Sequence, residues 1–254
     1  MKKIIEKLIV LVAVCVFCYS AYNLYLIFSD NAQEYVEIDE IHETIDAPKD
    51  SADDTELEKW VPDFDSLLAI NSDIVGYIIV DHTHISYPIV KGSDNDYYLD
   101  HTIYKSENYA GSIFMDYTAN SDFSDLNTFI YGHNVYHGTM FAELANYVDK
   151  AFFDAHPYIH LYTPNGNYKL QVFSAYVDTA ACDSYQMAFA NDQAFQNYLN
   201  LIISKSRYNS GVSVSSADRI VTLYTCSYEN ENPTASDGYI EDRYYIHAKL
   251  IKEF

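Results

Sequence analysis

The sequence predicts a mostly β domain with peripheral helices, in which short strands close into a barrel. Short runs of β-branched and aromatic residues recur from residue 75 to the C-terminus. Turn-forming segments separate these runs, and strands do not alternate with long helices as they do in parallel α/β sheets. Many short strands without that alternation favour a closed or nearly closed barrel that is mainly antiparallel.

Charge and cysteine content narrow the function classes. The 254 residues carry a formal charge of −22, with 37 acidic and 15 basic side chains. Nucleic-acid phosphates would be repelled by such a chain, so nucleic acid is not an expected partner. Two of the four cysteines, Cys15 and Cys18, lie in the first apolar segment, which leaves Cys182 and Cys226 in the body. A secreted disulfide scaffold would need more cysteines, although a Cys182–Cys226 bridge remains an alternative.

The N-terminus reads as a membrane anchor. Lys2, Lys3 and Lys7 precede Leu8–Phe28, a run of 21 uncharged residues. A helix of this length spans about 30 Å, the thickness of a bilayer's hydrocarbon core. The basic start and the acidic sequence beyond it predict a single-pass signal anchor over residues 1–29, with a cytoplasmic N-terminus. A cleaved signal peptide is the alternative, but no convincing small-x-small cleavage site follows.

An acidic segment follows the anchor. Residues 30–56 contain eleven Asp and Glu residues against Lys49 alone. This density predicts an extended, self-repelling extracellular stalk that holds a catalytic domain, residues 57–254, away from the membrane. A short helix within the stalk is compatible with the pattern. Apolar spacing then predicts a helix over Thr55–Asn71, with Asp63 capping the turn that begins at Phe64.

The remaining elements follow in order. Residues 139–148, 150–156 and 192–206 are expected to be helical. Asn165-Gly166 marks a hairpin turn between two strands. The expected strands are Gly76–Val80, Ile85–Val90, Gly111–Met115, Thr128–Tyr131, Tyr158–Tyr162, Tyr168–Asp178, Arg219–Cys226 and Arg243–Leu250.

Three side chains near strand ends suggest a reactive centre. Cys226 ends one strand and Arg243 opens the next, so antiparallel pairing would place them nearly opposite each other. A thiol beside a guanidinium is a plausible nucleophile with an anion stabiliser, and His133, after Thr128–Tyr131, can supply a base. Arg219 lies about 23 Å away at the other end of its strand, and Arg207 belongs to a helix. The alternative for Arg243 is an exposed ion pair with Glu241 or Asp242.

These segments resemble the sortases. Thr222-Leu223-Tyr224-Thr225-Cys226 is similar to their TLxTC signature, and Tyr131-Gly132-His133-Asn134 to their histidine motif. Asn95-Asp96-Tyr97-Tyr98-Leu99 and the segment from Ala110 to Asp116 are similar to class B sortases in particular. The resemblance runs from about residue 57 to the C-terminus. It implies an eight-stranded sortase barrel with an N-terminal helix and a helix before the penultimate strand.

The resemblance also implies a reaction. Cys226 would attack a C-terminal sorting motif, LPxTG-like or NPxTN-like, after its Thr and form a thioacyl-enzyme. A peptidoglycan amine would then accept the secreted protein, with His133 transferring protons and Arg243 assisting at the oxyanion. Beside this centre, Leu99, Tyr131, Tyr224 and Thr225 are candidates to line the peptide groove, with core packing an equal alternative.

Other readings remain open. A thiol endopeptidase would release its product to water, and a non-enzymatic surface binding module would use the 26 tyrosines with an inert Cys226. No cofactor is implied, and a zinc site is not expected, because glycines flank the His133/His137 pair and Pro157 interrupts the His156/His160 pair. The five other histidines are expected to be ordinary surface or strand residues, and Cys182 to be structural. The sequence departs from the usual sortase pattern at two places. Tyr224 stands where sortases often have a small residue, and the segment 227–242 is long and acidic. Both are expected to affect which sorting sequence is recognised.

Overall fold

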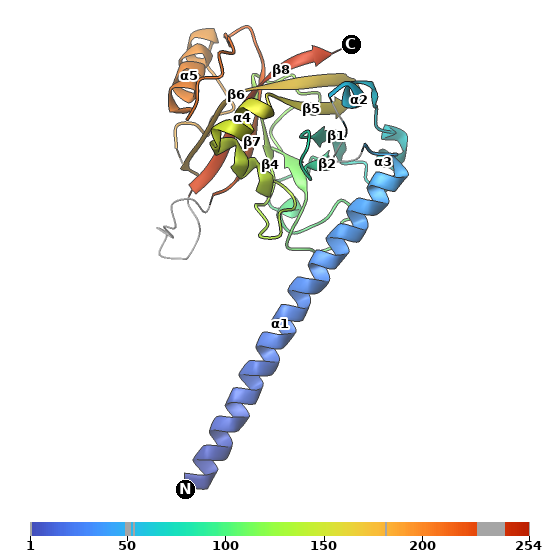
Figure 1. Ribbon diagram of the computed structural model, residues 1–254, viewed down its shortest axis with the longest axis vertical. Coiled ribbons are helices and arrows are strands. Elements are labelled where there is room, and N and C mark those ends of the chain that lie inside the picture. Colours follow the sequence, from blue (N-terminus) through green and yellow to red (C-terminus); the bar gives the residue numbers. More distant parts are fainter. Residues whose placement is uncertain (1, 49–51, 53, 181, 228–241, 254) are drawn as a thin grey trace.

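The strands form one closed barrel. The computed structural model describes residues 2–48, 52, 54–180, 182–227 and 242–253. The strand order is β1-β2-β3-β4-β7-β8-β6-β5, with β5 pairing back onto β1 (Figure 1). The strands are β1 (Ile74–Ile79), β2 (Ser86–Val90), β3 (Ile113–Met115), β4 (Asn127–Tyr131), β5 (Tyr158–Thr163), β6 (Gly166–Thr179), β7 (Ile220–Cys226) and β8 (Asp242–Glu253). The eight-stranded barrel predicted from the sequence is confirmed.

Two of the pairings are parallel, and one of them is central to the site. The pairs β2–β3 and β4–β7 run parallel, and the other six are antiparallel. A parallel pair needs a crossover, and the chain between β4 and β7 supplies one that includes the long β5–β6 hairpin and α5 (Asp192–Lys205). The ends of β4 and β7 therefore meet on the same side of the barrel.

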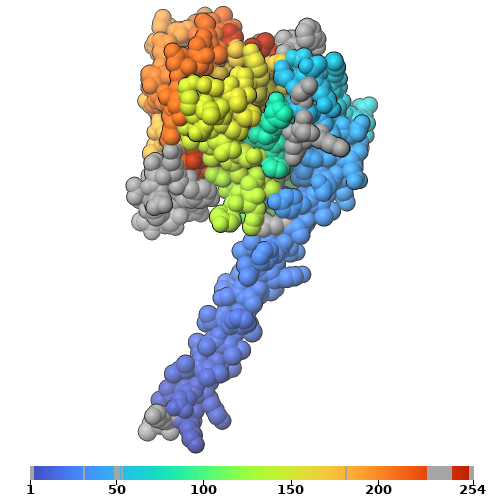
Figure 2. Space-filling model, in the orientation of Figure 1, coloured from blue at the N-terminus to red at the C-terminus, as the bar shows by residue number. Residues whose placement is uncertain are grey.

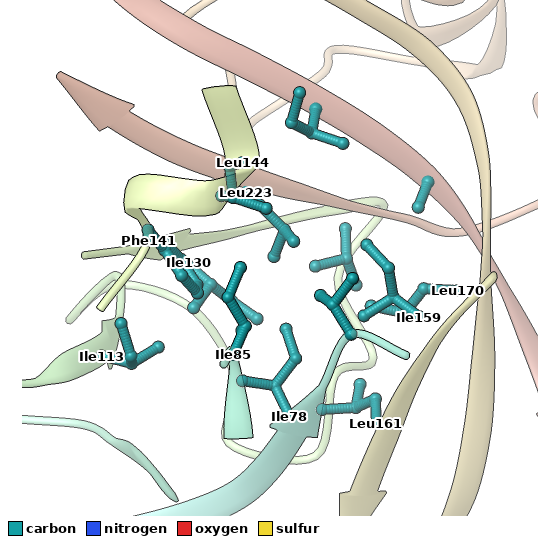
Figure 3. Packing of buried hydrophobic residues seen from close by; sticks show 14 of the residues in the cluster. Ile78, Ile85, Ile113, Ile130, Phe141, Leu144, Ile159, Leu161, Leu170 and Leu223 are labelled. Atoms are coloured by element: carbon teal, nitrogen blue, oxygen red, sulfur yellow. The ribbon is translucent and has the colours of Figure 1, made fainter. Parts of the chain in front are cut away.

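Apolar residues that alternate along the strands fill the barrel interior. Ile78, Ile130, Leu161, Leu170 and Leu223 point toward one another from five different strands (Figure 3). Outward-facing residues of the strands, such as Tyr77, Phe129 and Tyr162, form a second apolar cluster together with residues of the helices. This alternation is the period of two expected for a strand with packed surfaces on both sides.

The helices lie outside the barrel. Helix α5 precedes the penultimate strand β7, as predicted, and the segments expected to be helical near residues 139–156 form a 3₁₀ helix and a short α-helix. The remaining helical elements are α1 (Lys2–Thr44), α2 (Asp54–Lys59), α3 (Phe64–Ile70), η1 (Tyr97–Leu99), η2 (Ala142–Val148) and α4 (Lys150–Ala155).

The single helix predicted over Thr55–Asn71 is wrong, since the structure has two helices there. Pro62 lacks a backbone N–H and disfavours helical geometry at Val61, so α2 ends at Lys59. The chain restarts at α3, where the Asp63 carboxylate accepts a hydrogen bond from the Ser66 N–H at 3.1 Å. Asp63 is thus the N-cap that the sequence predicted.

The extended conformation predicted for the acidic segment is wrong for residues 30–44, which continue α1. Ile38, Ile41 and Ile45 recur at helical spacing among the acidic residues and pack against the barrel's outer cluster. The Asn108 side chain also donates to the Asp30 carbonyl at 2.8 Å. The barrel therefore lies against this part of α1, where the sequence suggested a spacer.

The first part of α1 projects away from the barrel. Figures 1 and 2 show it as a straight rod that extends well beyond the rest of the molecule. Its apolar side chains between Leu8 and Phe28 are largely exposed. Among the described residues, this is the one helix that is long and apolar enough to cross a membrane.

Candidate active site

The ends of β7 and β8 bring a thiol and a guanidinium together. Cys226 is the last residue of β7, and the antiparallel register pairs it directly with Arg243. Opposed residues of such a pair have Cα atoms about 4.5–5.5 Å apart. Leu223 faces the barrel interior, so Tyr224 and Cys226 alternate around the buried Thr225 and face outward. The thiol is half-buried on the outer wall of the barrel.

The parallel β4–β7 pair brings a histidine to the same place. Tyr131 is paired with Tyr224, and the Gly132 N–H donates to the Tyr224 carbonyl at 3.3 Å. His133 and Cys226 each lie two residues beyond the Tyr131–Tyr224 pair. Because the two strands run parallel, the chain leaves both of them at the same end of the barrel, and His133 and Cys226 line the same pocket.

A pocket of about 290 Å³ joins these groups. All seven residues singled out from the sequence line it: Leu99, Tyr131, His133, Tyr224, Thr225, Cys226 and Arg243. Thr225 differs from the rest because only 2% of its surface is exposed. Its contribution to the wall therefore comes mainly from the backbone.

Two hydrogen bonds fix the histidine segment. The His133 Nε2 lies 2.8 Å from the Leu99 carbonyl oxygen, and the Asn134 side-chain amide donates to the Cys226 carbonyl at 2.8 Å. Because a carbonyl oxygen can only accept, the imidazole donates this hydrogen bond from Nε2. Leu99 thus contacts the site through its backbone as well as lining the pocket.

Behind the pocket, a hydrogen-bonded network surrounds a buried carboxylate. Asp116 is 1% exposed and accepts hydrogen bonds from Tyr131 Oη and Asn95 Nδ2, each at 2.8 Å. Burial on its own would raise the pKa of Asp116, but hydrogen bonds from Thr118, Asn95 and Tyr131 outweigh it and lower the pKa. The ionised carboxylate holds the Tyr131 ring in place.

Sequence reasoning missed part of this wall. Asn95, Asp96, Phe114 and Tyr185 also line the pocket, and the Tyr185 hydroxyl lies 2.6 Å from that of Tyr131. Asn95, Asp96 and Phe114 belong to segments that carried the class B resemblance, which was the available signal. Tyr185 lies far along the chain in an irregular segment, and no sequence pattern marks it.

The guanidinium of Arg243 lies over an aromatic ring. Its Cζ is 5.8 Å from the centre of the Tyr224 ring, and Nη1 donates to the Asp242 carbonyl at 2.9 Å. Burial raises the pKa of Tyr224 to about 12, although the Arg243 charge opposes the rise. The phenol therefore stays neutral, and Arg243 presents its positive charge at the pocket wall.

The other candidate residues lie elsewhere. Neither Cys182 nor Cys226 is in a disulfide, and the Cys182 thiol lies 3.4 Å from the Tyr245 hydroxyl. Arg219 precedes β7 at its opposite end, as expected. His247 is a strand residue but fully buried. Most of the acidic segment 227–242 falls outside the described residues.

Comparisons with known proteins agree with this architecture. Residues 78–251 match the model of the Sortase domain family. Sortase B of Listeria monocytogenes is 34% identical over 250 residues, which cover 98% of both chains. A crystal structure of sortase B from B. anthracis matches with a TM-score of 0.73 and 34% identity over 89% of this chain and 100% of that one. A Staphylococcus aureus sortase B–substrate complex matches with a TM-score of 0.69 and 37% identity over 75% of this chain and 85% of that one.

The closed barrel, the helix before the penultimate strand and these matches lead to one conclusion. The chain belongs to the sortase family and, within it, to the sortase B transpeptidases.

Proposed function

We propose that this sortase B joins secreted proteins to peptidoglycan, with Cys226 as nucleophile, His133 as acid and base, and Arg243 as oxyanion stabiliser. The observation that carries the proposal is the single pocket that all three side chains line. Cys226 and Arg243 are directly paired across β7 and β8, and His133 follows β4, which runs parallel to β7. This arrangement supplies the nucleophile, the proton carrier and the positive charge that acyl transfer needs.

The reaction has two halves. Cys226 gives its thiol proton to His133, and the thiolate attacks the carbonyl carbon of the Thr in the sorting motif, so that negative charge develops on the carbonyl oxygen, near Arg243. His133 protonates the departing amine, the C–N bond breaks and a thioester remains. A peptidoglycan amine then attacks the thioester and gives up a proton to His133. The new amide forms as the thiolate leaves.

The peptide groove is proposed from the rest of the pocket wall. Leu99 is about two-fifths exposed and Tyr224 is half-buried. Both offer apolar surface beside Cys226. Tyr131 is held by Asp116 and supports the wall from behind, while Thr225 contributes backbone. The relative described as a sortase B–substrate complex has the same fold, which supports substrate binding by this chain.

We also propose that residues 1–29 anchor the chain in the cell membrane as a single pass, with a cytoplasmic N-terminus and the catalytic domain, residues 57–254, outside. The exposed apolar stretch of α1 and the lysines before it support this orientation. Because residues 30–44 are helical and contact the barrel, the domain would lie close to the bilayer surface.

Peptide transfer tests the proposal. Fluorogenic peptides carrying LPxTG-like and NPxTN-like motifs are incubated with the full-length chain, with and without a short glycine peptide as amine. Mass spectrometry should detect an amine adduct of the peptide cut after Thr, and Cys226→Ala should form none. Hydrolysed product alone, at every amine concentration, would instead identify a thiol endopeptidase.

A further inference from the structure

One wall of the catalytic pocket, the pocket around Cys226, comes from an irregular segment between β6 and α5. Tyr185 in this segment lines the pocket, and 37% of its surface is exposed. Its hydroxyl lies 2.6 Å from that of Tyr131, and its ring packs edge-on against Phe129 with the ring centres 5.0 Å apart. A side chain on an irregular segment keeps one position only where other contacts fix its backbone, so the contacts of this segment determine the shape of the wall.

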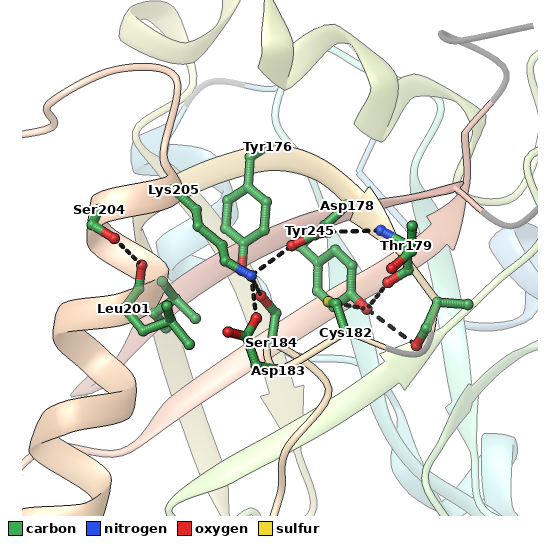
Figure 4. Close-up of polar contacts among 12 residues, drawn as sticks. Tyr176, Asp178, Thr179, Cys182, Asp183, Ser184, Leu201, Ser204, Lys205 and Tyr245 are labelled. Carbon is green, nitrogen blue, oxygen red and sulfur yellow. Dashed lines mark hydrogen bonds and ion pairs between the residues drawn. The ribbon is translucent and has the colours of Figure 1, made fainter.

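The first of these contacts is an ammonium group at the end of α5. Lys205, the last residue of α5, donates to Asp183 and to the Ser184 hydroxyl, the latter at 3.0 Å (Figure 4). These two acceptors directly precede Tyr185 in the chain. A third acceptor is Asp178 Oδ2, at 2.6 Å, near the end of β6. One side chain thus ties the irregular segment to a helix and to a barrel strand at once.

Two further hydrogen bonds hold the backbone on either side of Tyr185. The Tyr198 hydroxyl on α5 donates to the Ser184 carbonyl at 2.9 Å. The Asn127 side chain on β4 donates to the Gln186 carbonyl, also at 2.9 Å. Ser184 itself is fully buried. The backbone of Tyr185 is therefore held between two neighbours that are fixed by α5 and by β4.

The contact made by Lys205 differs from the other two because it is charged. Burial on its own would lower the pKa of Lys205, but hydrogen bonds to Asp178 and Asp183 outweigh it and raise the pKa. Hydrogen bonds between charged partners are about twice as strong as those between neutral groups. Removal of the ammonium should therefore loosen the segment more than removal of either neutral bond.

We propose that Lys205 is a positioning residue for the sorting peptide, because it holds the two residues before Tyr185 and so keeps that ring in the pocket wall. The inference rests on the proposed peptide groove and extends it to a residue that does not line the pocket. A wall that is formed for only part of the time weakens peptide binding in proportion to that fraction. The chemical step, which depends on Cys226, should proceed unchanged once the peptide is bound.

Two substitutions in the full-length chain, studied in detergent micelles, test this role. Lys205→Met keeps an unbranched apolar side chain but removes the ammonium. Asp183→Ala removes one acceptor, whose side chain is 63% exposed, and leaves the ammonium in place. The matched control is Lys150→Met, which removes the ammonium that contacts Asp154 within α4. The measurements are kcat and KM for the fluorogenic sorting peptide that the wild type transfers, and hydrogen exchange of residues 183–187.

Lys205→Met should raise KM by about three- to tenfold and leave kcat within about twofold of the wild type. If Lys205 only stabilised the fold, its loss would lower the amount of active enzyme and hence kcat, while KM would stay the same. Exchange of residues 183–187 should become faster in this variant, and Lys150→Met should match the wild type in both measurements. Asp183→Ala should raise KM in the same direction by less, and the double variant should exceed Lys205→Met by less than the sum of the two effects.

Several outcomes would overturn the role of Lys205. They are an unchanged KM or unchanged exchange in Lys205→Met, a fall in kcat alone, an equal rise in KM in Lys150→Met, and fully additive effects of the Lys205 and Asp183 substitutions. A wild-type chain that transfers no peptide would refute the proposed function instead. Hydrogen exchange would then still decide whether Lys205 orders the segment that carries Tyr185.

Discussion

Asn134 donates its side-chain amide to the backbone carbonyl of Cys226 at 2.8 Å, so the segment after β4 is tied to the end of β7. The last backbone bond between these strands is the longer one from Gly132 to Tyr224, at 3.3 Å. The Asn134 side chain thus links β7 to the segment after β4 beyond the last backbone hydrogen bond between the two strands. It holds His133 in the pocket that it shares with the thiol.

Asn134→Ala should therefore slow acylation more than it weakens peptide binding. A displacement of the imidazole of even 1 Å can reduce a rate by up to about 100-fold, and we expect a loss in kcat of about tenfold or more with little change in KM. Stopped assays with a sorting peptide measure both constants. Asn200→Ala, on the exposed face of α5, is the control. Equal effects of the two substitutions would refute a positioning role for Asn134.

Arg243→Lys tests whether the guanidinium, and not charge alone, is needed. Lysine keeps the positive charge but lacks the planar guanidinium, which in Arg243 lies over the Tyr224 ring beside β7. Removal of a donor to an oxyanion typically costs about 100- to 1000-fold in kcat, and we expect Arg243→Lys to approach this range. Arg219→Lys makes the same change at the other end of β7 and should retain full transfer. A fully active Arg243→Lys enzyme would exclude the proposed role.

Gly132→Ala should destabilise the protein because the site's backbone packs too closely for a side chain. A Cβ at Gly132 would overlap Ile113 Cδ1 and lie 2.8 Å from Phe141 Cδ2. Such overpacking costs about 1–3 kcal/mol in the free energy of unfolding. Ile113→Val removes the nearest atom, so the double variant should recover part of the loss in denaturant unfolding. If the single variant unfolds like the wild type, the close packing at Gly132 is not as the structure describes it.

Sequence patterns predicted the barrel well because each strand is marked by its own residues. β-branched and aromatic runs identified all eight strands, and Cys226 and Arg243 emerged as neighbours because consecutive antiparallel strands place their ends together. His133 was harder, since β4 and β7 are far apart in sequence. Its position after a strand end makes it a candidate base, and the family's histidine motif relates it to the thiol.

The errors also have physical causes. The density of acidic residues after the anchor favoured an extended segment over a helix. Ile38, Ile41 and Ile45 nevertheless recur at helical spacing, and they pack this part of α1 against the barrel. The apolar pattern continues across Pro62, but the proline interrupts the helix there. Tyr185 reaches the pocket from an irregular segment, and such a placement depends on tertiary packing that local sequence does not encode.

A buried histidine should make stability sensitive to acid well away from the active site. His247 is fully buried, and burial together with the Lys205 charge lowers its pKa to about 3. Thr222 Oγ1, which donates to Asn127, lies 2.8 Å from Nδ1, and the Tyr176 hydroxyl lies 2.9 Å from Nε2. These partners suit a neutral ring that donates from Nδ1 and accepts at Nε2.

The unfolded chain binds a proton at His247 below its ordinary pKa of about 6.5, whereas the folded chain does not until about pH 3. Stability from the neutral ring is therefore complete above about pH 6.5 and decreases as the pH falls toward 3, by up to about 1.4 kcal/mol per pH unit. His247→Gln should be less stable at neutral pH but should lose less on acidification to about pH 5, where most carboxylates remain ionised. Denaturant unfolding across this range measures the difference, with the exposed His82→Asn as control. Parallel pH profiles for the wild type and His247→Gln would show that another group causes the acid sensitivity.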